Sequence, residues 1–158
     1  MQEPRPVRIK SVLFPKIYLR MDARNVIGAG AGGGTINCQY GAGPWEELLL
    51  VLQPDGTNAF ASLSFPGVYL RLDGRGLTEP QEHGGGVVSC HMGVGPLEKF
   101  WIMDVPDGSG TVIESSAFKG VFLRMDGANV KIFDKMGGGK VNAQYSAGDH
   151  ERFVLEYQ

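Results

Sequence analysis

Residues 65–77 read FPGVYLRLDGRGL, and residues 84–104 read GGGVVSCHMGVGPLEKFWIMD. Closely matching segments precede them as FPKIYLRMDARNV and GGGTINCQYGAGPWEELLLVL, and follow them as FKGVFLRMDGANV and GGGKVNAQYSAGDHERFVLEY. The arginines shared by the three copies, Arg20, Arg71 and Arg124, lie 51 and 53 residues apart. A fixed period of this length is the signature of internally repeated architectures. The chain therefore consists of three copies of one unit.

Each unit contains short segments whose apolar residues alternate with polar ones, which is the pattern of β-strands. In residues 68–73, Leu70 and Leu72 point to one side, and the Arg and Asp between and after them point outward. Glycine-rich turns separate such segments, and no stretch has a convincing helical period. We expect three leucines to occupy matching positions in one shared core: Leu19, Leu70 and Leu123.

Three units of about four strands have few ways to close into one structure. A propeller needs more blades, and a solenoid leaves open ends, whereas a closed barrel removes sheet edges. The sequence therefore predicts an all-β fold, the β-trefoil, with a six-stranded barrel and a hairpin cap. We expect a single domain over residues 1–158, with repeats at approximately 8–57, 58–110 and 111–158.

Three motifs carry a resemblance to a known family: GVYLRLDG at 67–74, KVNA at 140–143 and GPLEKF at 95–100. In these motifs the chain resembles the fascin-like branch of the β-trefoils, which implies the same fold and a role in binding actin. The ricin-type branch carries a Gln-x-Trp signature in its last strand. This chain has Glu46-Glu47-Leu48 and its counterparts there, so the ricin-type sugar-site residues do not transfer.

Charge and composition exclude several classes of partner. The 158 residues carry a formal net charge of −2 without a basic block, which argues against nucleic acid. No apolar run is long enough for a membrane span, and the start MQEPRPVRIK lacks a signal-peptide core. We expect a cytoplasmic protein, or one exported without a classical signal peptide, that is a monomer or a small homo-oligomer. The third repeat ends with the chain, so we expect no second domain.

The two cysteines occupy equivalent strand positions, Cys38 and Cys90, with Ala143 in the third unit. Small apolar residues at matched positions predict reduced thiols in the core rather than a disulfide. The three histidines share no metal-ligand spacing, and no serine lies in a Gly-x-Ser-x-Gly elbow. We therefore expect binding rather than catalysis, and neither a metal nor a cofactor.

Two sets of polar residues are candidates for ligand contacts. The first is the aspartate of each Arg-x-Asp pair, which either accepts hydrogen bonds from a ligand or begins a turn. The second follows the triple glycines, beside long loops at 23–31, 74–83 and 127–136, and either binds a polyhydroxylated ligand or is simply exposed on its strand. The predicted site residues are Asp126, Asn142, Gln144, Asp22, Asn37, Gln39, Asp73 and His91, with the third unit expected to be the best site.

Loops that differ between units on a repeated scaffold are a usual place for recognition. The turn residue Trp45 is either an exposed apolar anchor or a plug for the barrel end. We expect a carbohydrate-binding module, a lectin for glycans or glycoconjugates, with up to three shallow sites acting together. The alternatives are a fascin-like actin-binding module, a protease inhibitor or another protein-binding module, and the targeting part of a larger toxin or enzyme system.

Overall fold

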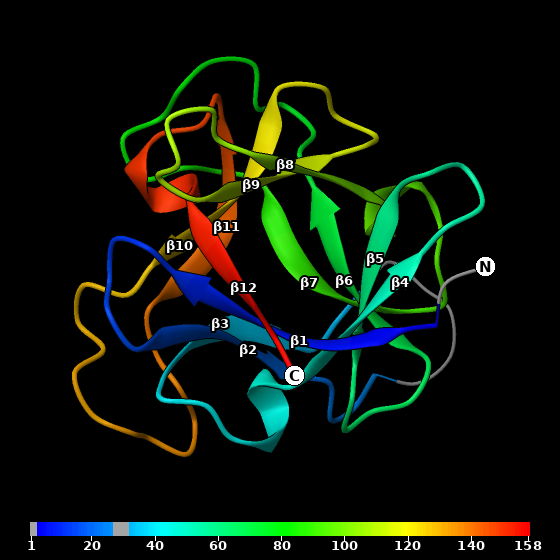
Figure 1. Ribbon diagram of the computed structural model, residues 1–158, viewed down its shortest axis with the longest axis vertical. Helices are drawn as coiled ribbons and strands as arrows, with labels where there is room; N and C mark the ends of the chain where they lie inside the picture. Colours follow the sequence, from blue (N-terminus) through cyan, green and yellow to red (C-terminus); the bar gives the residue numbers. More distant parts are fainter. Residues whose placement is uncertain (1–2, 27–31) are drawn as a thin grey trace.

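The computed structural model describes residues 3–26 and 32–158 (Figure 1). The last five residues of the predicted loop 23–31 lie outside the described residues. The strands are β1 (Arg5–Ser11), β2 (Ile17–Asp22), β3 (Thr35–Tyr40), β4 (Leu48–Leu52), β5 (Asn58–Ser62), β6 (Val68–Asp73), β7 (Val87–Met92), β8 (Phe100–Asp104), β9 (Thr111–Ser115), β10 (Val121–Asp126), β11 (Lys140–Tyr145) and β12 (Phe153–Tyr157). No helix in the described part of the chain is long and apolar enough to cross a membrane.

Six of the strands form a closed barrel, in which every neighbouring pair is antiparallel. The ring runs β1–β4–β5–β8–β9–β12 and returns to β1. The other six strands form three hairpins, β2–β3, β6–β7 and β10–β11, one from each unit. A six-stranded barrel capped by three hairpins is the β-trefoil arrangement, so the fold predicted from the repeat is confirmed.

The core lies where the barrel and the cap meet, and equivalent residues of the three units fill it. Leu19, Leu70 and Leu123 are completely buried in one apolar cluster, as the alternation predicted. Cys38 and Cys90 are buried there as free thiols, which confirms the expectation of reduced core cysteines.

Backbone bridges between units close a ring around the cap. The middle glycine of each triplet pairs with the second hairpin strand of another unit: Gly33 with Cys90, Gly85 with Ala143, and Gly138 with Cys38. Each bridge consists of two N–H···O hydrogen bonds of 2.7–2.9 Å. The first unit is thus hydrogen-bonded to the second, the second to the third, and the third to the first.

The glycine triplets are required by the closeness of these bridges. Gly137 has a φ of +67°, and a Cβ there would lie 2.7 Å from the carbonyl oxygen of Cys38. Gly84, its counterpart in the second unit, has a φ of +69°, and a Cβ there would lie 2.5 Å from the carbonyl oxygen of Ala143. Only glycine combines this backbone conformation with so close an approach.

A glutamate caps the 3₁₀ turn before the last strand of each unit. The turns are η1 (Pro44–Glu46), η2 (Pro96–Glu98) and η3 (Asp149–Glu151). The carboxylate oxygen Oε1 of each glutamate accepts a 2.6 Å hydrogen bond from the glycine N–H three residues earlier. The glutamate of the repeated Glu-x-apolar motif is therefore a structural residue.

Candidate ligand-binding cleft

The three aspartates predicted as site residues begin the turns that follow β2, β6 and β10. The Oδ1 atoms of Asp22, Asp73 and Asp126 accept backbone N–H groups at 3.0–3.1 Å, and the donors are Arg24, Arg75 and Ala128. Of the two interpretations that the sequence left open, the structure shows this turn role directly. Side-chain hydrogen bonds from Arg24 and Arg75 also lower the pKa of Asp22 and of Asp73.

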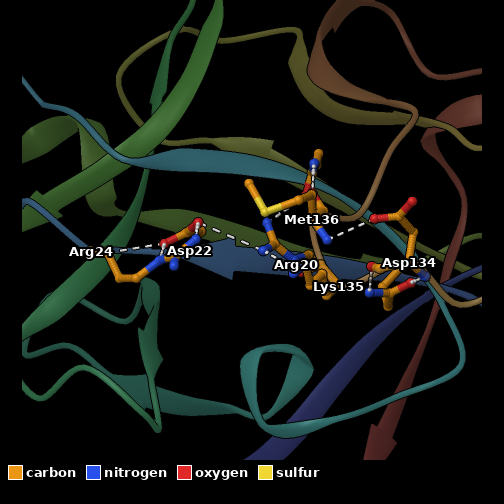
Figure 2. Close-up of polar contacts among 8 residues, drawn as sticks. Arg20, Asp22, Arg24, Asp134, Lys135 and Met136 are labelled. Carbon is orange, nitrogen blue, oxygen red and sulfur yellow. Dashed lines mark hydrogen bonds and ion pairs between the residues drawn. The ribbon is translucent and has the colours of Figure 1, made fainter.

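The arginine of the Arg-x-Asp pair does not face solvent as the strand alternation predicted. Arg20 is only 1% exposed, because the loop after β10 folds over it. Its Nη2 donates to the carbonyl oxygen of Lys135 at 3.0 Å, and the same atom lies 3.6 Å from Asp22 Oδ2. Figure 2 shows Arg20 between the Asp22–Arg24 pair and residues 134–136. The guanidinium therefore ties the first unit to the third.

The amides of the first unit hold the backbone of that same loop. Asn37 donates through Nδ2 to the carbonyl oxygen of Met136 at 3.0 Å. Gln39 donates through Nε2 to the carbonyl oxygen of Asp134 at 2.6 Å and accepts the N–H of Asp134 at 3.2 Å. The Gln39 residue is 2% exposed, so its amide serves to position the loop.

The third unit repeats this arrangement with the loop of the second unit. Asn142, which is 4% exposed, donates to the carbonyl oxygen of His83 at 2.9 Å. Gln144 exchanges two hydrogen bonds with the backbone of Gln81, at 2.9 Å and 2.5 Å. The predicted cluster of Asp126, Asn142 and Gln144 thus exists within one hairpin, but its amides are engaged with protein backbone.

His91 takes the place of these glutamines in the second unit. Its Nδ1 lies 3.3 Å from the carbonyl oxygen of Gly93 and 3.7 Å from the Glu98 carboxylate. The three predicted clusters are each assembled within their own hairpin, and the structure does not bring them together into one site. The expectation that these amides lie on an exposed strand face is wrong for Gln39 and Asn142, because a loop of another unit covers them.

An open cleft lies between the β3–β4 turn of the first unit and the loop between β10 and β11. In Figure 1 the loop, drawn in gold to orange, lies at the lower left, and the cyan turn with η1 runs from there to the bottom centre. The cleft has a volume of about 260 Å³ and is lined by Arg20, Gln39, Gly43, Pro44, Trp45, Glu46, Phe133 and Lys135. Two aromatic side chains from segments far apart in sequence therefore face the same hollow.

Packing fixes the indole of Trp45. The Cζ atoms of Arg20 and Arg24 each lie 4.7 Å from the centroid of its ring, within the distance of a cation–π contact. The Phe65 ring lies 5.6 Å away, centroid to centroid. Trp45 is half-buried and lines a cleft, so it is neither a free anchor nor a plug for the barrel. The Trp45 side chain is therefore already ordered, so it would lose little conformational entropy when a ligand binds.

Glu46 also lines the cleft, where it is almost completely buried. Burial raises its pKa, although the hydrogen bond from Gly43 opposes this shift. In the second and third units the equivalent glutamates, Glu98 and Glu151, lie 3.8 Å from the Nε of an arginine. Among the described residues no such ion pair within 4.0 Å joins Glu46 to Arg20. Because a carboxylate has about four lone-pair sites, Glu46 retains capacity to accept further hydrogen bonds.

The sequence does not predict this cleft, although it contains partial signals. Trp45 stands in a turn and Phe133 in a loop that varies between units, but 88 residues separate the two side chains. Nothing local in the sequence indicates that the loop of one unit lies on the turn of another. Within the described residues, no group of three or more His, Cys, Asp or Glu side chains is placed to hold a metal ion.

Comparison with known proteins finds structures of similar fold but no match by sequence. No protein-family model matches the chain, and no curated protein sequence matches it. The structure is similar to part of a mosquitocidal holotoxin, with a TM-score of 0.69 and 13% identity over 98% of this chain. The chain spans 16% of that toxin's length.

Two further similar structures match over nearly their whole length. ThreeFoil, a designed 3-fold symmetric protein, has a TM-score of 0.68 and 17% identity, over 95% of this chain and 96% of its own. SeviL, solved bound to asialo-GM1 saccharide, has a TM-score of 0.62 and 12% identity, over 98% of both chains. At these identities the likeness establishes the architecture, and the chain has the β-trefoil fold.

Proposed function

We propose that this protein binds carbohydrate without catalysing a reaction, and that its principal site is the cleft between Trp45 and Phe133. The observation that carries the proposal is that two aromatic side chains line one hollow together with Glu46 and Lys135. Sugars present an apolar face of C–H groups together with a rim of hydroxyls. A site with flat apolar walls and a few fixed polar groups is complementary to both.

The polar groups of the cleft suit hydroxyl recognition. Glu46 can accept hydrogen bonds from two neighbouring hydroxyls, and Lys135 donates only. Gln39 belongs to the cleft as a positioning residue, because both ends of its amide already hold Asp134. Of the residues predicted from the sequence, Gln39 is the one that lines this cleft.

The proposal favours one principal site over three equal ones. In the third unit, His150 takes the sequence position of Trp45, and Pro80 of the second unit's loop takes that of Phe133. The aromatic pair therefore occurs at the junction of the first and third units and is not repeated at that of the third and second. A volume of about 260 Å³ is near the lower end of the usual ~300–1,000 Å³ for small-molecule sites, so we expect a short glycan segment and modest affinity. The solved complex of SeviL with asialo-GM1 saccharide supports this proposal, because it pairs the same fold with a glycan.

A glycan array with the purified protein, followed by calorimetric titration of the best glycan, tests the proposal. Replacing the aromatic walls, Trp45→Ala or Phe133→Ala, should weaken binding by about tenfold or more, equivalent to about 1.4 kcal/mol. Leu97→Ala is the matched control, because Leu97 occupies the position of Trp45 in the second unit. Absence of binding across a broad array, or equal losses in Trp45→Ala and Leu97→Ala, would contradict the proposal.

The role of Glu46 can be separated from its role as a cap. Glu46→Gln keeps an oxygen to accept the Gly43 N–H but removes the charge, so the fold should persist while glycan affinity falls. Protonation of Glu46 also removes its charge, so it should lower the glycan affinity as well. Because burial raises the pKa of Glu46, wild-type affinity should decline on acidification at a higher pH than an ordinary glutamate would produce, and Glu46→Gln should abolish that step.

A further inference from the structure

The loop between β10 and β11 presents an exposed apolar surface at its apex, residues 131–136. Ile132 is 75% exposed, Phe133 62% and Met136 55%. Lys131 and Lys135 are exposed on the same apex. Burying large apolar side chains stabilises a protein, so leaving three of them in water on one short segment forgoes that stabilisation. Figure 1 shows the loop, in gold to orange, extending from the body of the molecule at the lower left.

Hydrogen bonds to the first unit hold the backbone of residues 134–136 in this apex. The carbonyl oxygens of Asp134, Lys135 and Met136 all accept hydrogen bonds from side chains of the first unit. Within the loop, Asp134 Oδ1 accepts the Met136 N–H at 2.9 Å, and the Gly137 N–H donates to the carbonyl oxygen of Asp134 at 2.8 Å. The exposure of the apolar residues is thus built into a rigid support.

The second unit provides an internal comparison. Its apex, residues 78–83, is held by the same amide hydrogen bonds, with Gln81 and His83 in the places of Asp134 and Met136. By this register Glu79 and Glu82 occupy the positions of Ile132 and Lys135. The backbone support is shared, but the chemistry is inverted, because one apex is acidic and polar and the other is apolar and basic.

We propose that the 131–136 apex binds the surface of an anionic lipid bilayer. Apolar side chains flanked by lysines are what peripheral proteins place at the boundary between headgroups and acyl chains. Lysines near an anionic leaflet add electrostatic attraction to it. The apex protrudes beside the cleft, so it suits a deformable surface into which side chains enter. In the proposed contact the apex reaches only the boundary of the bilayer. Asp134, the one acidic residue of the apex, uses its carboxylate to accept the Met136 N–H within the turn.

This inference is independent of the glycan proposal, although the two are compatible. Phe133 and Lys135 line the cleft, and Ile132 lies beside them in the chain. A bilayer that received the apex would therefore place its own headgroups next to the cleft. Sugars attached to that membrane would be presented to Trp45 and Glu46 at high local concentration.

Sedimentation with sugar-free vesicles tests the inference. The wild-type protein should bind vesicles of phosphatidylcholine with phosphatidylserine, bind phosphatidylcholine alone more weakly, and be released by high salt. Ile132→Ser with Met136→Ser should weaken binding by about tenfold or more, because interfacial affinity scales with the apolar area inserted. Lys131→Glu with Lys135→Glu should abolish the preference for anionic vesicles.

Matched variants distinguish this contact from binding through the cleft and from self-association. Glu79→Ser with His83→Ser alters the equivalent positions of the second apex and should leave vesicle binding unchanged, as should Trp45→Ala in the cleft. Circular dichroism should show that all variants are folded, since the side chains changed in the two apices are exposed and Trp45 lies outside the core cluster. The inference is overturned by absence of binding to anionic vesicles, by unchanged binding of the Ile132/Met136 variant, or by loss in Trp45→Ala. It is also overturned if light scattering finds a wild-type dimer that the Ile132/Met136 variant dissociates, because the apex would then be a self-association surface.

Discussion

Cys38 and Cys90 illustrate how the core treats a reactive residue type. Burial raises the pKa of both thiols to about 12. In addition, the Sγ of Cys38 lies 3.7 Å from the carbonyl oxygen of Asp126, at the seam between the first and third units. These cysteines therefore serve as small apolar core residues. Their reaction with a thiol reagent indicates whether the cap is folded.

Thiol labelling should therefore follow unfolding. At pH 8 a thiol with a pKa near 12 is ionised in roughly one molecule in ten thousand, and only the thiolate reacts. We expect an alkylating reagent to modify neither cysteine in the native protein, and both at the rate of a free thiol in denaturant. Mass spectrometry after timed labelling measures this. Rapid native labelling of either residue would contradict the burial described above.

At the scale of single residues the sequence predicted the interior well and the polar face poorly. Alternation alone assigned Leu70 and Leu72 to the core, because side chains alternate strictly along a strand. It also predicted that Arg20 points outward into solvent, because alternation along one strand contains no information about a loop of another unit that covers the strand. The amides of Asn142 and Gln144 were correctly grouped beside a long loop. Their partners, however, lie about 60 residues away in the chain.

At the scale of elements, the glycine triplets determine how the hairpins are joined. Each triplet allows the backbone of one unit to approach a strand of another within hydrogen-bond distance. The sequence indicated turn geometry at these glycines, and the positive φ values agree with that interpretation. The bridge between units was not predictable, because local sequence carries no information about which strand the turn will meet.

Two alanine substitutions separate close approach from backbone conformation. Gly137 and Gly76 both have positive φ, but a Cβ at Gly137 would meet Cys38 backbone at 2.7 Å, whereas at Gly76 nothing lies within 4 Å. Gly137→Ala should therefore lower the free energy of unfolding by about 1–3 kcal/mol more than Gly76→Ala does. Urea denaturation followed by circular dichroism gives both values. Equal losses would show that the backbone moves aside without cost.

At the scale of the whole molecule, the barrel and the ring of bridges together link every unit to both others. β1 of the first unit pairs with β12 of the third over Val7–Ser11, which closes the barrel where the chain ends meet. Arg20 and Gln39 add side-chain links from the first unit to the third. No unit of this kind has a core of its own, because its apolar residues face a cluster shared by all three.

The molecule should therefore unfold in one cooperative step. Trp45 lies in the first unit and Trp101 in the second, so their fluorescence reports on two units, and far-ultraviolet circular dichroism reports on all strands. The urea transitions from the two probes should coincide, and the labelling of Cys38 and Cys90 should share their midpoint. Separate midpoints would mean that a unit can open while the others remain folded.

The anchoring of each long loop on a different unit has a consequence for how such a protein changes. The backbone of residues 134–136 is held by Arg20, Asn37 and Gln39, so substitutions of the exposed apex side chains should change the chemistry of this surface without disturbing its shape. The lining of the Trp45 cleft can therefore change through mutations in a distant part of the gene. A single copy of the repeat would carry only one wall of such a cleft, so the cleft requires at least two joined copies.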